Sequence, residues 1–481
     1  MNFSMVRYVL GRLLQVQAYL LGIPLIVSFI YREPIQYKTS FLIVIILLTV
    51  IALISNGKKP ENKRMTAKDG FVIVALSWIL FSFFGSLPFF ISGDIPSLVD
   101  AFFETSSGFS TTGSSILTDV EALSHSMLFW RSFTHLIGGM GILVFALAVL
   151  PQMDSESVYI MKAEVPGPTF GKLVSKLSST ARILYIIYIS MTVMVIILLL
   201  FGGMNLFDAV LHGFGVAGTG GFGVRNGSLA SYDSAYIDYV IGIGMLVFGV
   251  NFNLYYMVLI GQAKDAFKSE EFRWYLGIIF AAISMICLNL FSTYDSVSVL
   301  FRDVFFTVSS VITTTGFSTA DFGTWPLFSQ MILLLLMFFG GSAGSTAGGL
   351  KISRIVLMGK IVGSEVKRIA QPNRVVSIRY DNKPLDKQIK HTVANYIVVY
   401  FILFTGLLLV IGLDTPDFLS AFSSVTATFN NIGPGLGAFG PTSSYVDLSD
   451  PSKILLSFTM LAGRLEIFPM IILFLPQTWK R

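Results

Sequence analysis

The sequence predicts an all-α integral membrane protein, and three observations support this: its composition, its long apolar runs and a four-fold internal repeat. The 481 residues are 54% hydrophobic and only 13% charged, and their mean hydropathy is +0.74. Soluble globular proteins carry about 25% charged residues. The chain therefore has the composition of a protein whose surface faces lipid, and its 43 Gly residues favour close packing between helices.

Ten apolar runs are long enough to cross the roughly 30 Å of hydrocarbon in a bilayer. They lie near residues 10–30, 40–55, 71–92, 126–150, 183–203, 236–261, 275–292, 328–350, 392–412 and 453–475. Arg7 and Arg12 precede the first run, as they would in a signal peptide, but no small-x-small cleavage site follows. We therefore interpret the first run as a retained span, which gives ten spans in all.

Positive charge sets the expected orientation of these spans. Most of the 33 Lys and Arg residues lie in the two tails and in four loops, 56–70, 151–182, 262–274 and 351–391. Basic loops stay in the cytoplasm, so both termini are expected there. These loops explain the basic charge without nucleic-acid binding, and the single Cys287 excludes an internal disulfide framework.

The last eight spans form four pairs, and a segment rich in Ser, Thr and Gly separates the members of each pair. In three segments an Asp lies 13 residues before a glycine, and in the fourth a Ser takes its place: Asp100 and Gly113, Asp208 and Gly221, Asp303 and Gly316, Ser420 and Gly433. The intervening stretch is too short to span a membrane and predicts a re-entrant helix, with the Asp or Ser as its N-cap. Each unit is therefore span, pore helix, loop and span.

Two spans per unit return the chain to the same side, so four units of one orientation can surround a single axis as a pseudo-four-fold pore. A secondary transporter built from inverted repeats would need an odd number of spans in each repeat. The expected divisions are a two-span N-terminal unit at 1–69 and pore repeats at 70–160, 161–263, 264–360 and 361–481.

Each pore helix leads into a short loop whose Thr and Gly content suits ion binding by backbone carbonyls. The four loops are Ser110-Thr111-Thr112-Gly113, Gly218-Thr219-Gly220-Gly221, Thr313-Thr314-Thr315-Gly316 and Asn430-Asn431-Ile432-Gly433. Potassium filters replace the hydration shell of the ion with backbone carbonyls, and glycine reaches the backbone angles that this requires. One TTG is a weak signal for such a filter, but four loops at matching offsets are specific.

On these spans and loops the chain resembles the Trk/Ktr/HKT superfamily of potassium transporters over nearly its whole length. The two N-terminal spans are similar to the extra pair of the Trk-type branch, the membrane subunit of a bacterial Trk system. In the family one filter glycine per unit governs potassium preference, and a serine in the first unit accompanies sodium transport. The four glycines here imply potassium, while GTGG in the second loop and NNIG in the fourth leave the number and strength of ion sites open.

The resemblance also implies a gated, channel-like potassium uptake subunit, which forms a homodimer in the bacterial cytoplasmic membrane. Family members bind a cytosolic nucleotide-sensing ring, so a TrkA-like partner would hold ATP or NAD and act on the basic loop 351–391. No part of this chain resembles a nucleotide-binding fold. Potassium at the filter is therefore the expected ligand of the chain, as its substrate, and no cofactor is expected on it.

The eighth span contains ten consecutive small residues, five of them Gly: Gly340, Gly341, Ser342, Ala343, Gly344, Ser345, Thr346, Ala347, Gly348 and Gly349. Each Gly costs about 1 kcal/mol of helix stability relative to Ala, so a straight helix is not expected. This Gly-rich segment is either a close-packed kink or an intramembrane loop below the filter that blocks flow and moves on activation. The family uses the matching segment of its third unit as such a gate.

The final span carries Arg464 and Glu466, which this topology makes the only basic residue and the only carboxylate inside a span. A charge at membrane depth costs roughly 2.5–3.5 kcal/mol and faces the protein interior. Residues two apart do not share a helix face, so separate partners are expected rather than a pair between these two. By resemblance, Arg464 matches an arginine that faces the pore near the gate, which implies a barrier role.

Two other functions are compatible with a polytopic chain. A symporter that couples potassium to sodium or protons would need a titratable group on the path, and Glu466 is the candidate. A membrane enzyme would need a nucleophile–base pair, metal ligands or paired acids, and the sequence has no HExxH, no GxSxG and no paired carboxylates in its spans. The four histidines share no metal-ligand spacing and are expected to be packing or interfacial residues: His125, His135, His212 and His391. We therefore expect a transport protein and not an enzyme.

Overall fold

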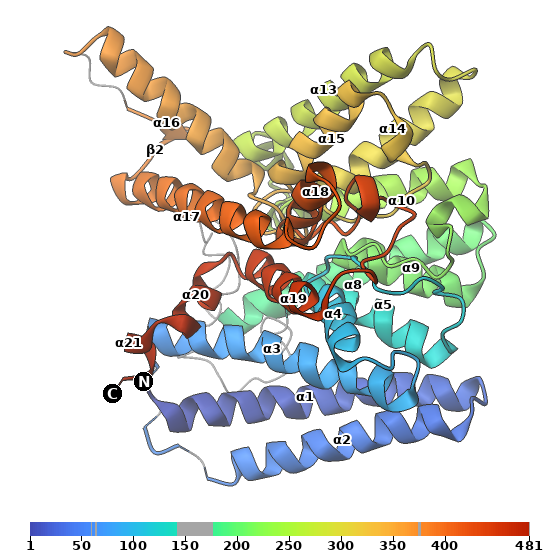
Figure 1. The fold of residues 1–481 in the computed structure, drawn as a ribbon. Helices are drawn as coiled ribbons and strands as arrows, with labels where there is room; N and C mark the ends of the chain where they lie inside the picture. The colour runs from blue at the N-terminus through green and yellow to red at the C-terminus, as the bar shows by residue number, and fades with distance from the viewer. Residues whose placement is uncertain (59, 63–64, 142–176, 374–376, 481) are drawn as a thin grey trace.

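The computed structural model describes residues 1–481 apart from 59, 63–64, 142–176, 374–376 and 481 (Figure 1). The regular secondary structure of the described residues is helical except for one short antiparallel pair, β1 (Arg379–Tyr380) and β2 (Lys383–Pro384). A mostly helical chain was the first expectation from the composition, and it is confirmed.

Six helices are long and apolar enough to cross a membrane in the part that the structure describes. They are the two helices of the N-terminal unit and the first helix of each predicted pair: α1 (Phe3–Ile30), α2 (Ile35–Asn56), α3 (Ala67–Ser92), α8 (Leu177–Phe201), α13 (Glu270–Leu290) and α17 (Lys387–Ile411). The shortest has 21 residues, or about 32 Å at 1.5 Å per residue. Each can therefore cross the hydrocarbon without a break.

The second helix of each pair is shorter, and here the structure departs from ten straight spans. These helices are α5 (His125–Gly139), α10 (Ala235–Phe248), α15 (Leu327–Phe339) and α19 (Asp450–Arg464). They have only 13–15 residues, about 20–23 Å, so none covers roughly 30 Å of hydrocarbon alone. The sequence predicted such a break only in the segment 340–349.

After each break the chain takes a different course. α11 (Phe252–Leu259) follows α10 at 90°, and this bent pair counted as one span raises the number of apolar spans from six to seven. α16 (Ile352–Ala370) follows α15, and α20 (Phe468–Phe474) with α21 (Pro476–Trp479) follows α19. The apolar runs 236–261 and 453–475 are therefore interrupted, and neither is one continuous helix. The end of the run 126–150 and the boundary between residues 160 and 161 lie outside the described residues.

A short helix lies between the two members of every pair: α4 (Leu98–Phe109), α9 (Leu206–Gly218), α14 (Val297–Ile312) and α18 (Phe418–Phe429). The expected N-caps of these pore helices are wrong. The capping side chains are Ser97, Asn205 and Asp417, which places Asp100, Asp208 and Ser420 in the first turn. Asp303 lies inside α14, which begins at Val297. Several polar residues near each helix start share the same cap preference, so the sequence alone could not choose among them.

The remaining elements lie in the connections: η1 (Ser228–Tyr232), α12 (Ala263–Phe267), η2 (Phe322–Thr324) and η3 (Gly437–Phe439). The N-terminal pair covers the first unit, because α1 packs against α2, α3 and α5. The buried Gln17 of α1 donates its amide to the Phe81 carbonyl of α3 at 2.8 Å. The two ends of the chain are drawn near each other in Figure 1, and both contact the start of α3: the Asn2 N–H donates to Asp69 at 3.0 Å, and Lys68 donates to the Gln477 carbonyl at 2.7 Å.

The cap of α18 can be tested by substitution. Asp417 accepts the Ser420 N–H at 2.9 Å and the Ser420 hydroxyl at 2.8 Å, and these two bonds hold the pKa of Asp417 below its ordinary value. Asp417→Ala should lower the free energy of unfolding by about 1 kcal/mol, seen as a lower thermal midpoint of the purified protein in detergent. Asp417→Asn keeps an acceptor oxygen and should lower the free energy of unfolding by less. Equal losses for Ala and Asn would contradict the capping role.

Candidate functional site

The four pore helices end in the same backbone turn, although their loops differ in sequence. In each loop the residue two positions before the glycine has a left-handed φ: Thr111 (56°), Thr219 (52°), Thr314 (55°) and Asn431 (58°). The N–H of the next residue bonds the carbonyl five residues earlier at 2.8–2.9 Å, in the pairs Thr112–Ser107, Gly220–Gly215, Thr315–Ser310 and Ile432–Ala427. This bond completes a Schellman helix end. GTGG and NNIG therefore keep the backbone geometry of the other two loops.

The glycines that close the four loops form a ring. Gly113, Gly221, Gly316 and Gly433 have φ of 84°, 74°, 86° and 97°, a region that other residues rarely adopt. A Cβ built on each would meet a carbonyl oxygen of the next unit: Gly113 with Gly220 at 2.2 Å, Gly221 with Thr315 at 1.9 Å, Gly316 with Ile432 at 2.1 Å, and Gly433 with Thr112 at 2.7 Å. The order one, two, three, four and back to one closes the ring, and no side chain has room at these positions.

Side-chain hydrogen bonds join the first and fourth loops. The Asn431 amide donates to the Thr112 hydroxyl at 2.9 Å. The hydroxyls of Ser114 and Tyr445 both donate to the Gly433 carbonyl at 3.0 Å. A hydroxyl–hydroxyl contact of 2.7 Å recurs within two loops, Ser110–Thr112 and Thr313–Thr315. The polar side chains of the loops are buried, so this bonding fixes the positions of the loops.

The ring offers backbone carbonyls and no ionisable side chain. None of the residues in the four loops is an acid or a base. Among the described residues, no group of three or more His, Cys, Asp or Glu side chains is placed to hold a metal ion. Carbonyl rings can replace the hydration shell of a monovalent cation. The arrangement therefore suits the passage of a partly dehydrated cation.

The Gly-rich segment 340–349 lies directly against two of the loops. The Gly348 N–H donates to the Thr314 hydroxyl at 2.6 Å, and the Gly349 N–H donates to the Asn430 carbonyl at 3.1 Å. A Cβ on Gly348 would lie 2.4 Å from the same carbonyl oxygen. The segment has no regular helix between α15 and α16, as its Gly content predicts, and it is packed too tightly at Gly348 for a larger residue.

The break between α10 and α11 meets the same segment. The Ser342 N–H donates to the Gly249 carbonyl at 2.9 Å, and the Phe252 N–H donates to the Gly344 carbonyl at 3.0 Å. Two interrupted stretches of backbone therefore supply each other's missing partners, as membrane depth requires.

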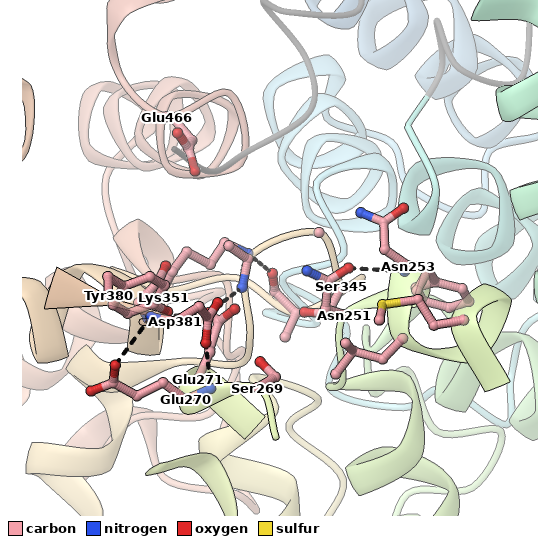
Figure 2. Close-up of a pocket in the computed structure, with 18 of the residues that line it drawn as sticks. Asn251, Asn253, Ser269, Glu270, Glu271, Ser345, Lys351, Tyr380, Asp381 and Glu466 are labelled. Carbon is pink, nitrogen blue, oxygen red and sulfur yellow. Dashed lines mark hydrogen bonds between the residues drawn. The ribbon is translucent and has the colours of Figure 1, made fainter. Parts of the chain in front are cut away.

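A cavity of about 920 Å³ borders the segment (Figure 2). On its wall the Glu271 carboxylate of α13 accepts the N–H groups of Ala343 at 2.7 Å and Ser353 at 3.1 Å, so one side chain holds residues near both ends of the segment. The buried Lys351 ammonium donates to the Ala347 carbonyl. The sequence analysis missed Glu271 and Lys351, because both belong to stretches assigned to basic cytoplasmic loops.

Arg464 and Glu466 have separate partners, as the sequence predicted. Arg464 donates to three backbone carbonyls: Thr346 of the segment at 2.5 Å, and Gly138 and Gly139 at the end of α5 at 2.8 and 2.5 Å. Glu466 forms two bonds to the Arg354 guanidinium of α16, at 3.1 and 2.5 Å. Arg464 therefore joins the first unit to the Gly-rich segment, and Glu466 joins the last break to α16.

The expectation that Arg464 is the only basic residue inside a span is wrong, and so is the expectation that Glu466 is the only carboxylate there, because Asp238 lies in α10. Arg131 lies within α5 with 3% of its side chain exposed, and its Nε contacts Oε1 of Glu104 on α4 at 2.6 Å. Arg131 is near the start of its apolar run and was assigned to the outer loop. A buried pair of opposite charges is tolerated where a single charge is not, but such a pair is visible only after α4 has packed against α5.

Comparisons with known proteins agree on one family. The family model described as TrkH, cation transport protein, matches residues 36–480. The chain is 36% identical to the "Trk system potassium uptake protein TrkH" of Escherichia coli (strain K12), over 100% of both chains. It is 32% identical to the TrkG protein of the same strain, over 95% of this chain and 94% of TrkG. The crystal structure of the potassium transporter TrkH from Vibrio parahaemolyticus superposes with a TM-score of 0.89, 32% identity and full coverage of both chains.

The ion pair between Glu466 and Arg354 gives a testable stability difference. Glu466→Gln removes the charge opposite a largely buried Arg354 and should lower the free energy of unfolding by about 2 kcal/mol. Glu365→Gln is the matched control, because its pair with Arg368 is exposed and should contribute less than about 1 kcal/mol. Thermal unfolding of both purified variants in detergent measures the difference. Equal midpoints would show that the buried pair contributes no more than the exposed one.

Proposed function

The chain belongs to the TrkH family of cation transport proteins, and we propose that it takes up potassium through a pore lined by its four loops. The observation that carries this proposal is the closed ring, in which each glycine of left-handed φ abuts a carbonyl of the next unit. The relatives compared above are named as potassium uptake proteins or potassium transporters, and not as enzymes. In this proposal eight spans form four repeats around the pore, and the N-terminal pair beside them brings the total to ten.

In the proposed mechanism the Gly-rich segment and Arg464 form the gate. The segment bonds the third and fourth loops through Gly348 and Gly349, so an ion leaving the ring on that side meets it. Arg464 holds the segment through the Thr346 carbonyl and adds a fixed positive charge, which raises the barrier for a cation. Opening requires the segment to leave these bonds.

Coupled symport is the second candidate. A coupled proton or sodium ion would need a titratable acid on the path. Glu466 is paired with Arg354, and Glu271 accepts two backbone N–H groups, so both carboxylates already have structural partners. This favours channel-like conduction driven by the potassium gradient and the membrane potential.

The proposed setting is a bacterial cytoplasmic membrane, with both termini in the cytoplasm and two copies in the assembly. The curated relatives are named as parts of a Trk system, and the proposed partner is a TrkA-like cytosolic ring that binds ATP or NAD. α16, whose far end projects beyond its neighbours (Figure 1), and the basic residues that follow it to 391 are the proposed contact with this ring.

Flux into liposomes that contain the purified protein tests the proposed function. Potassium and rubidium should enter faster than sodium, and the reversal potential should follow the potassium gradient alone. An absence of potassium flux from folded protein would contradict the pore. A reversal potential that shifts with the sodium or proton gradient would select the symporter.

The ring glycines should set ion preference. A side chain at Gly113 would meet the Gly220 oxygen at 2.2 Å, so Gly113→Ser must displace that carbonyl. We expect the potassium-to-sodium permeability ratio to fall about tenfold, which corresponds to about 1.4 kcal/mol, in reversal-potential measurements.

Gly93→Ser is the matched control for this substitution. Gly93 has the same left-handed φ, 86°, but open space around it at the end of α3. Its substitution should leave the permeability ratio unchanged. Equal ratios for the two variants would remove Gly113 from the ring that selects the ion.

Arg464 should hold the gate closed. Arg464→Gln removes the charge and weakens the bond to Thr346, and a barrier lower by about 1 kcal/mol would raise basal flux about fivefold. The basal flux of Arg464→Lys should lie between those of wild type and Arg464→Gln, because lysine keeps the charge but lacks the several donors of the guanidinium.

Lys453→Gln is the control for Arg464, because it breaks the buried pair with Asp100 at the other end of α19. It should alter stability without altering basal flux. The yield of folded protein is measured beside single-channel current. A loss of yield with no rise in current for Arg464→Gln would leave Arg464 a structural role only.

A further inference from the structure

The second loop lacks two side chains that the other loops have. Gly218 stands where the others carry Ser110, Thr313 or Asn430, and Gly220 stands where they carry Thr112, Thr315 or Ile432. Its backbone nevertheless makes the same turn. Two consecutive glycines at 220 and 221 give this loop more conformational freedom than its neighbours. Some other part of the molecule must restrict it.

His135 of α5 occupies the space of the missing side chains. A Cβ on Gly218 would lie 2.3 Å from the His135 carbonyl oxygen, and a Cβ on Gly220 would lie 2.3 Å from Nδ1 of the His135 ring. The ring is fully buried and stacks on Phe222, the residue after Gly221, at 4.2 Å between centroids. Neither ring nitrogen has a hydrogen-bond partner among the residues that the structure describes. The ring therefore acts on the second loop through its shape and packing.

Arg131, one helical turn earlier on α5, contacts the same loop. Its guanidinium lies 3.5 Å from the centre of the Phe222 ring and donates to the Gly223 carbonyl at 3.0 Å. Its counter-charge, Glu104, accepts the Ser115 hydroxyl and the Ile116 N–H, each at 3.0 Å, just beyond the first loop. One face of α5 thus connects the chain after the first loop to the chain after the second.

This arrangement is specific to the boundary between the first and second units. The position nine residues before the ring glycine carries an acid only in the first unit, since its members are Glu104, His212, Thr307 and Ser424. The second loop is also the one with glycine at both variable positions. These two asymmetric features therefore meet at one place, on the face of α5.

We propose that His135, supported by Arg131, is a positioning residue that substitutes for the missing side chain of Gly220 and thereby sets the preference of the ring for potassium over sodium. This inference rests on the proposed function and deepens it. A carbonyl ring discriminates between ions only while its oxygens keep their number and spacing. Without the His135 ring, the Gly220 carbonyl, which abuts Gly113, loses the packing that holds it in place.

A double-mutant cycle tests the proposal. Gly220→Thr gives the second loop the threonine that the first and third loops carry at this position, but the new Cβ collides with the His135 ring. His135→Ala removes the ring and leaves Gly220 without a packing partner. Each change alone should lower the potassium-to-sodium permeability ratio. The double variant places a Thr in the vacated space and should recover the ratio, with a coupling of at least about threefold, as expected for residues in contact. Reversal potentials and the yield of folded protein are measured for all four proteins.

A matched pair of residues away from the ring controls for packing alone. A Cβ on Gly202, just after α8, would lie 2.8 Å from the Tyr236 ring at the start of α10. Gly202→Ala, Tyr236→Ala and the double variant therefore repeat the same glycine–ring cycle at a site away from the ring of loops. These variants should change folded yield and leave the permeability ratio unchanged.

The outcomes separate this inference from the proposed function. Suppose the wild-type protein prefers potassium. The positioning role is refuted, and the pore remains, if the effects of the two substitutions on the permeability ratio simply multiply in the double variant. The same holds if His135→Ala folds normally and has an unaltered permeability ratio. If Gly220→Thr alone does not fold, the ratio of His135→Ala decides: a lower ratio supports the proposal and an equal ratio refutes it. A wild-type protein that conducts no potassium would overturn the proposed function itself.

Discussion

Backbone groups that leave helical geometry at membrane depth must find partners inside the protein, because lipid offers none. The rest of this structure depends on that constraint. All four second helices end early, and several of the freed groups find their partners in other units. The carbonyls of Gly138 and Gly139 accept bonds from Arg464, the break after α10 exchanges bonds with the Gly-rich segment, and that segment bonds Asn430 of the fourth loop. The loops keep their positions because the breaks beside them are mutually satisfied.

The buried charges follow from the same requirement. An arginine has five donors and no acceptor, so Arg464 can serve three carbonyls that a neutral side chain could not satisfy together. Glu271 does the converse and accepts two N–H groups, one from Ala343 within the Gly-rich segment and one from Ser353 after it. Both charges lie beside interrupted backbone. In the proposed pore, the effect of these charges on a cation is added to a structural role that the broken helices already demand.

Local patterns in the sequence were enough to predict the four short helices α4, α9, α14 and α18 and the loops that follow them. The 13-residue offset and the terminal glycine are short-range features, and they place each loop at the end of a short helix between two apolar runs. The breaks at Gly249 and Glu466 were not predictable in this way. Each break involves only a few residues in the middle of an apolar run. The broken backbone is stabilised by partners more than 90 residues away, such as Ser342 for Gly249 and Arg354 for Glu466.

Side-chain contacts that form only when distant helices and loops pack together were also beyond reach of the sequence. The pair of Glu104 and Arg131, and the fit of His135 against Gly220, exist only after α5 packs between the first and second loops. A histidine in an apolar run is most simply a packing residue, and His135 is one; what the sequence does not show is which backbone it packs against. The left-handed residues Thr111, Thr219, Thr314 and Asn431 were likewise hidden, because helix ends of this type are usually marked by Gly.

Because the four quarters of the ring are encoded separately in one chain, a mutation changes only one of them at a time. In a pore made from four identical subunits, one nucleotide change is copied into every quarter at once, and most such changes are intolerable. Here a mutation in one quarter leaves the other three unchanged. A side chain lost from a loop can be replaced by one on a neighbouring helix, as His135 fills the space beside Gly220. Such a gene can therefore change one loop at a time, and the second and fourth loops differ from TTG in sequence while they keep the same backbone turn.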